Sequence, residues 1–209
     1  MDLEAQRLAT AHSAVRLEYL TLVVAVGEAL VALISGILAG SVALVAFGAD
    51  SVIETISGFV VLGQLLTLAQ NRSAKRWNEH RSHRFLAVLF YTLALYVVVS
   101  AGWSILGRHH PHENVLGIAV SIFSAVAMPL LAWSKRTTAH RLSEHGLASL
   151  SRLLLADAAE TALCSLLAVS TLIGVSLAWR HWWWADAVAS LAVVYFALRE
   201  GREAWECEA

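Results

Sequence analysis

The sequence predicts an all-α membrane protein, a bundle of six transmembrane helices. Hydrophobic residues make up 58% of the 209 residues and charged residues only 15%, a composition far from that of a soluble domain of this length. The apolar residues fall into six long stretches, and a helix needs about 20 such residues to cross a hydrocarbon core. Short polar segments separate the stretches, so we expect consecutive helices to run antiparallel.

Each predicted helix is bounded by a recognisable break. The first is too long for the apolar part of a signal peptide and lacks a cleavage pattern, so we keep it as a mature helix. Gly40 and Ser41 end it; a basic segment, a histidine-containing loop, a second basic segment and a tryptophan-rich turn separate the others. Asp186 is expected to cap the last helix. The predicted helices cover 17–39, 42–66, 85–106, 115–133, 147–177 and 182–198.

The basic residues predict the orientation and the domain organisation. Lys and Arg gather before the first helix, in segment 71–84, between the fourth and fifth helices (Lys135, Arg136, Arg141) and after the sixth, whereas only Arg108 and Arg180 fall on the other side. By the positive-inside rule, both termini are cytoplasmic. We therefore expect a cytoplasmic segment 1–16, a transmembrane domain 17–199 and a cytoplasmic tail 200–209, in a multi-pass protein of a bacterial plasma membrane.

The partners that this organisation predicts are the lipid bilayer and small ions. Segment 71–84 could in principle bind anionic lipid or nucleic acid, but its basic residues are better explained as determinants of topology. We therefore expect no nucleic-acid partner. The loop His109–Glu113 could collect metal ions, although short polar loops contain histidines by chance.

Acidic residues inside the predicted helices are the main functional signal. A charge at the centre of a bilayer costs about 2.5–3.5 kcal/mol, so such residues rarely occur without a role. The predicted helices contain no lysine, and Arg152 is the only nearby cation, which leaves a bound cation or protons to balance the charge. A single acid could be a neutral contact between helices, but facing pairs favour a functional site. Five acids within the predicted helices carry this signal: Glu28, Asp50, Glu54, Asp157 and Glu160.

Two pairs of these side chains have helical spacing. Asp50 with Glu54, and Glu160 with Cys164, are each four residues apart and so share one face of a helix. An internal repeat with an offset of 110 residues aligns Asp50 with Glu160 and Glu54 with Cys164. Polar positions that recur on two helices near the midplane are typical of a transporter site.

Three runs of residues resemble the cation diffusion facilitator, or cation efflux, family. They lie in the second, fifth and sixth predicted helices, in the order in which that family has them. The resemblance implies six helices with cytoplasmic termini and, because the chain stops soon after the sixth helix, the transmembrane-only branch that lacks the C-terminal cytoplasmic domain. The runs are 40–46 followed by Asp50 and Glu54, 156–160 followed by Cys164, and 183–191.

The resemblance also implies a metal site and a mechanism. Its ligand positions correspond to Asp50, Glu54, Glu160 and Cys164, a set without imidazole, and Phe47 stands where the family usually has another Asp. Family members carry a divalent cation out of the cytoplasm by alternating access in exchange for protons. Carboxylates with a thiolate suit Zn²⁺ best and leave Fe²⁺, Mn²⁺, Co²⁺ or Cd²⁺ open.

Several expectations complete this prediction. Glu28 and Asp157 are candidates for second-shell groups or for a proton relay. The cation is a substrate rather than a permanently bound cofactor, no arrangement for enzyme catalysis is present, and a homodimer is a further candidate assembly. A membrane metal sensor or accessory subunit that binds without transport is the alternative function, and a scaffold that binds no metal is a third.

Overall fold

The described part of the chain forms six α-helices and no strands. The structure is a computed structural model, and it describes residues 3–69, 79–107, 112, 114–180, 182 and 184–206. This architecture confirms the predicted all-α bundle. The helices are α1 (Leu3–Ala39), α2 (Val42–Ala69), α3 (Glu79–Leu106), α4 (Val115–Glu144), α5 (Ala148–Trp179) and α6 (Trp184–Glu206).

The helices are longer than the apolar stretches that predicted them. Helix α1 begins at Leu3 instead of residue 17, and α4 continues to Glu144 instead of ending at residue 133. Hydropathy marks the apolar part of a helix, whereas backbone hydrogen bonding continues into polar turns. Five helices, α1 to α5, are long and apolar enough to cross a membrane. Helix α6 carries Arg199, Glu200 and Arg202 in its second half, which lowers its hydropathy.

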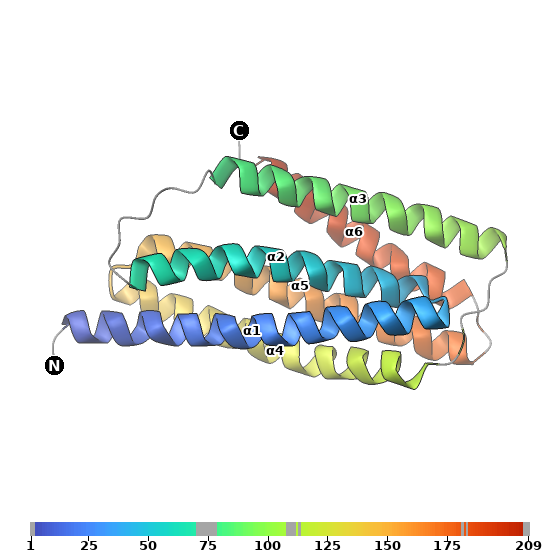
Figure 1. Ribbon diagram of the computed structural model, residues 1–209, viewed down its shortest axis with the longest axis horizontal. Helices are drawn as coiled ribbons and strands as arrows, with labels where there is room; N and C mark the ends of the chain where they lie inside the picture. The colour runs from blue at the N-terminus through green and yellow to red at the C-terminus, as the bar shows by residue number, and fades with distance from the viewer. Residues whose placement is uncertain are drawn as a thin grey trace.

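The helices are arranged in three pairs (Figure 1). Helices α2 and α5 lie in the middle, with α1 and α4 on one side and α3 and α6 on the other. The beginning of α1 and the end of α6 lie at the same end of the bundle, together with the end of α4. We call this the terminal end, and the end that contains Ala39, Leu106 and Trp179 the opposite end.

Helix α2 begins at a contact with α6. The Ser41 hydroxyl donates to Oδ1 of Asp186 at 2.5 Å, and the Val42 N–H donates to Oδ2 at 2.8 Å. Asp186 therefore accepts from the free N–H groups at the start of α2. Asp186 lies in the first turn of α6, as the sequence predicts, but its described hydrogen bonds cap α2 instead of its own helix.

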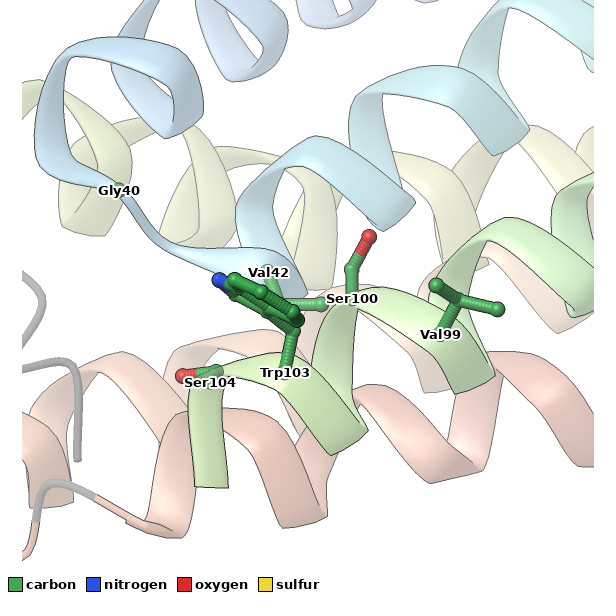
Figure 2. A pocket seen from close by; sticks show the side chains of 6 residues that line it. All are labelled: Gly40, Val42, Val99, Ser100, Trp103 and Ser104. Carbon is green, nitrogen blue, oxygen red and sulfur yellow. The ribbon is translucent and has the colours of Figure 1, made fainter. Parts of the chain in front are cut away.

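A cavity of about 320 Å³ lies at the opposite end, beside the turn between α1 and α2 (Figure 2). Val42, Val99 and Trp103 give it a mainly apolar lining, and Ser100 and Ser104 supply its hydroxyl groups. Among the described residues that line it, none has an acidic or thiol side chain.

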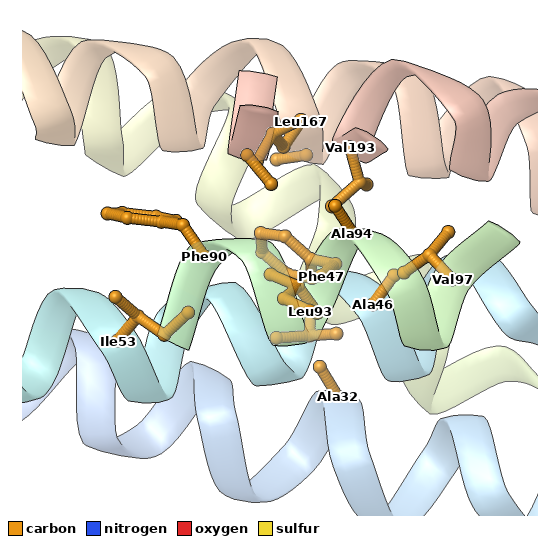
Figure 3. Close-up of a cluster of buried hydrophobic side chains, with 13 residues drawn as sticks. Ala32, Ala46, Phe47, Ile53, Phe90, Leu93, Ala94, Val97, Leu167 and Val193 are labelled. Atoms are coloured by element: carbon orange, nitrogen blue, oxygen red, sulfur yellow. The ribbon is translucent and has the colours of Figure 1, made fainter. Parts of the chain in front are cut away.

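A cluster of buried apolar side chains lies where α2 and α5 pack against α3 and α6 (Figure 3). Phe47 of α2 is completely buried there, among Leu93 and Val97 of α3 and Leu167 of α5. The resemblance implies an acid at position 47, but Phe47 belongs to the hydrophobic core. The first acid of α2 is therefore Asp50.

Glycines bring α1 and α2 unusually close together. A Cβ atom at Gly36 would lie 2.7 Å from the backbone nitrogen of Val45, and one at Gly48 would lie 2.8 Å from that of Leu33. Only glycine fits such approaches. The φ angle of Gly40 is +64°, a left-handed conformation that lets the chain turn between the two helices.

Candidate cation site

Three of the four predicted ligands meet between the two middle helices. The sulfur of Cys164 lies 3.0 Å from Oδ2 of Asp50 and 2.9 Å from Oε2 of Glu54. Asp50 and Glu54 share one face of α2 because they are one turn apart, and Cys164 faces them from α5. All three are buried, at 8%, 3% and 1% exposure.

The fourth predicted ligand, Glu160, points to a neighbouring hydroxyl. Its Oε2 accepts a hydrogen bond of 2.9 Å from Ser57, which lies on α2 three residues beyond Glu54. Glu160 is half-buried, less enclosed than the other three. The carboxylate therefore lies beside the cluster of Asp50, Glu54 and Cys164, and its described hydrogen bond is to Ser57.

The cluster is not a ready-made metal site. Within the described ranges, no three His, Cys, Asp or Glu side chains are arranged to hold a metal ion. In a tetrahedral zinc site a ligand sulfur and a ligand oxygen lie about 3.5 Å apart, as the usual Zn–S and Zn–O lengths imply. The contacts of Cys164 are about half an ångström shorter, so a cation would have to push these ligands apart.

Glu28 of α1 lies in the same bundle interior. It is 2% exposed, and neither of its carboxyl oxygens makes a hydrogen bond to a described residue. Its polar neighbours are Ser124 of α4, whose hydroxyl also makes no such hydrogen bond, and Glu54. Glu28 thus lies near Glu54 of the cluster and makes no described hydrogen bond to it.

A buried lysine binds two acids next to this cluster. Nζ of Lys135, on α4, lies 3.1 Å from Oε2 of Glu18 on α1 and 2.5 Å from Oδ2 of Asp157 on α5. It also donates to the Thr161 hydroxyl at 3.3 Å. The side chains of Lys135 and Glu18 are fully buried. We call these four residues the lysine cluster.

The lysine cluster corrects the sequence analysis in two respects. Lys135 was expected in a basic segment that sets topology, but it lies within α4 and inside the bundle. Glu18 lies near the start of the first predicted helix, and only its contact with Lys135 on another helix distinguishes it from an ordinary acid at a helix end. For Lys135 the sequence contains one signal: Lys135, Ala139 and Leu142 recur at the spacing of one helix face. In the structure all three residues are completely buried.

The outcome for Asp157 follows from the same contacts. It was a candidate second-shell group or proton relay, and in the structure its carboxylate is the partner of Lys135. The expectation that protein countercharge is scarce is therefore wrong for Asp157 and Glu18. The described contacts give Asp50 and Cys164 no cationic partner.

Several predictions fall outside the described residues. These are Arg108, the basic residues at 72, 75 and 76, most of the histidine-containing loop and Trp183. His112 of that loop is described; it is exposed, and its N–H donates to the Ala39 carbonyl at 2.7 Å.

The comparisons with known proteins agree with this architecture. No curated protein is detectably similar in sequence. The family model described as the cation efflux transmembrane domain matches residues 19–206, nearly the whole chain and all the helices that carry the cluster. The chain therefore belongs to the cation efflux family of divalent cation transporters.

Proposed function

We propose that this protein exports a divalent cation, Zn²⁺ most readily, from the cytoplasm in exchange for protons. The cation would bind to Asp50, Glu54 and Cys164, and Glu160 would turn from Ser57 to complete the site. The observation that carries this proposal is the placement of one thiol within 3.0 Å of two carboxyl groups in the bundle interior. Alternating access to this site from the two membrane faces would produce transport.

The donor set supports the choice of metal. One thiolate and three carboxylates provide four donors, the number that Zn²⁺ takes in tetrahedral sites. The sulfur favours Zn²⁺ or Cd²⁺ over harder ions such as Mn²⁺, while Fe²⁺ and Co²⁺ are intermediate candidates.

The close contacts of Cys164 support exchange for protons. A neutral thiol has one proton and can donate to only one of its two carboxyl neighbours. The second contact, and the proximity of two acids, are favourable only if a carboxyl group also carries a proton. A cation that binds here must displace these protons, because metal ligands have to be deprotonated. Lys135 does not remove this need, since two other carboxylates already surround it.

Two further proposals concern the surroundings of the site. Glu28 would carry a proton during exchange, because it is buried near Glu54 without a described hydrogen bond. The positive-inside rule would place the terminal end of the bundle in the cytoplasm. A bacterial plasma membrane as its location and the assembly of two copies into a homodimer stay predictions.

Metal flux into proteoliposomes across an imposed pH gradient tests the proposed function. We expect Asp50→Asn to abolish zinc flux while the protein still inserts and folds, because the amide keeps the size but loses a ligand charge. Glu144→Gln, the same chemical change at the exposed end of α4, is the matched control and should transport normally. Wild-type flux in Asp50→Asn would contradict the site, whereas zinc binding without flux in the unmodified protein would favour the sensor or accessory subunit.

A further inference from the structure

The lysine cluster lies next to the candidate cation site and joins three helices. Lys135 on α4 contacts Glu18 on α1 and both Asp157 and Thr161 on α5. Helix α2 closes the fourth side, since a Cβ atom at Gly58, one turn beyond Glu54, would lie 2.9 Å from Oε1 of Glu18. All four helices that surround the interior thus meet at this level.

The α5 partners of Lys135 share a helix face with Cys164. Thr161 follows Asp157 by four residues, and Cys164 follows Thr161 by three, so the three side chains form one stripe. Each of them is at most 3% exposed. Any rotation or sliding of α5 that moved Asp157 and Thr161 away from Lys135 would also move Cys164 away from Asp50 and Glu54.

The energetics of buried ion pairs suggest why these charges are present. Desolvation offsets most of the attraction in such a pair, so it adds little net stability over apolar packing. The best-attested use of buried polar contacts is to fix the register of one helix against another. Nζ of Lys135 meets two groups on one stripe of α5, Asp157 at 2.5 Å and Thr161 at 3.3 Å, so a rotation or shift of α5 changes both distances at once.

We propose that Lys135 is a positioning residue of the cation site: it fixes the rotation and axial position of α5 through Asp157 and Thr161, and so directs Cys164 toward Asp50 and Glu54. This inference rests on the proposed function, because it assigns Cys164 a role as a ligand. Lys135 itself does not touch the cation. Its role is to set the distance between the thiol of α5 and the carboxylates of α2.

Two isosteric substitutions distinguish an effect on the position of α5 from an effect of the lost charge alone. Asp157→Asn and Glu18→Gln each remove one negative charge from beside Lys135, but only the first loosens α5; the second leaves both α5 contacts in place. In a Cys207→Ser parent, Cys164 is the single cysteine, so the ultraviolet charge-transfer band of a cadmium–thiolate bond reports on it alone. Equilibrium dialysis gives the amount of bound Cd²⁺, and the measured quantity is the band per bound ion at saturation.

We expect Asp157→Asn to lower the band per bound Cd²⁺ and to raise the Kd for Cd²⁺ about tenfold, in the range typical of groups that orient metal ligands. Glu18→Gln should keep the parent ratio. A purely electrostatic effect would weaken binding yet restore the full band at saturation, and this result would overturn the inference. So would an equal loss of band in both variants, because the effect would then not be specific to α5.

Two additional variants keep the test decisive. If Asp157→Asn does not fold, Thr161→Val removes the other α5 contact without changing any charge, and it should also lower the band per bound ion; an unchanged ratio would overturn the inference. Ser170→Ala removes a hydrogen bond of 3.1 Å from α5 to Ala189 of α6, away from the lysine cluster, and should keep the parent ratio. A parent without any cadmium–thiolate band would overturn Cys164 as a ligand, and a parent that binds no Cd²⁺ at all would overturn the cation site as well. A parental band that persists in every variant would overturn only the positioning role.

Discussion

Cys164 is the residue on which the chemistry of the proposed site depends most. It packs against Met128 and Leu131 of α4, as a small apolar residue would, yet its sulfur also touches two carboxyl groups. A mid-helix cysteine that served only as packing would not need acidic neighbours. The two carboxyl groups beside its sulfur are the reason why we propose a ligand that alternates between a proton and a cation.

Exchanging the donor atom of Cys164 should change the metal preference. A carboxylate is a harder ligand than a thiolate, so Cys164→Asp is expected to shift selectivity from Zn²⁺ and Cd²⁺ toward Mn²⁺. Cys164→Ala should weaken the binding of the soft ions. Competition binding with pairs of metals measures both effects. The same preference in both variants as in the wild type would mean that Cys164 only fills space and that the carboxylates bind the ion.

Glu28 should influence proton exchange more than metal binding. Its carboxyl group is buried near Glu54 and does not touch Asp50 or Cys164 by any described hydrogen bond. Because a bound cation favours the ionised form of a nearby carboxyl, Glu28→Gln is expected to release about one proton fewer per zinc ion bound. A pH indicator in weakly buffered protein solution measures this release. An unchanged proton count would remove Glu28 from the exchange.

At the scale of the helices, contact between α1 and α2 depends on glycine at particular positions. Gly36 and Gly48 face the backbone of the neighbouring helix at distances that admit no side chain. Gly27, on another part of α1, has nothing within 4 Å of the place where its Cβ would be. The sequence alone does not distinguish these glycines, because they differ only in which atoms of the neighbouring helix each one faces.

The two kinds of glycine provide a matched pair for stability. Gly36→Ala should force α1 and α2 apart and destabilise the protein by about 1–3 kcal/mol, the usual cost of overpacking. Gly27→Ala should leave stability unchanged or raise it by up to about 1 kcal/mol, since alanine favours helix. Thermal unfolding in detergent compares the two variants. Equal stability of both would contradict the close approach of α1 to α2.

At the scale of the whole molecule, the antiparallel order of the helices separates two sets of ends. The beginning of α1 and the ends of α4 and α6 lie together at the terminal end (Figure 1), and His112, whose N–H donates to the Ala39 carbonyl, lies at the opposite end. The structure shows which segments share a side. The basic residues are what assign one side to the cytoplasm.

Labelling of one introduced cysteine at a time in intact cells tests this assignment, since the remaining Cys164 is buried. In a Cys207→Ser background, His112→Cys should react with an impermeant thiol reagent added outside, and Ser143→Cys near the end of α4 should react only after the cells are opened. Both positions are exposed, so accessibility of the side chain does not limit the reaction. The reverse pattern would overturn the orientation and with it the proposed direction of export.

The sequence by itself determined the class of protein, the presence and order of six helices, and the placing of Asp50, Glu54 and Cys164 on facing sides of two helices. Each of these depends on local properties: apolar length identifies a helix, and spacing of four residues places Asp50 with Glu54 on one face. The contact of Cys164 with both acids agrees with the prediction from the repeat, because that repeat places polar positions on two helices that pack together. The ends of α1 and α4 were predicted less well, since a helix continues beyond its apolar part.

Only the tertiary structure decided which charges are paired. Lys135, Glu18 and Asp157 come from three helices, and the nearest two of these residues in the sequence are 22 positions apart. The same applies to Ser57 as the partner of Glu160 and to Asp186 as the cap of α2. Pairing depends on the distance between side chains across helix interfaces. That distance is set by how the helices rotate and pack, and the order of residues along one helix does not contain it.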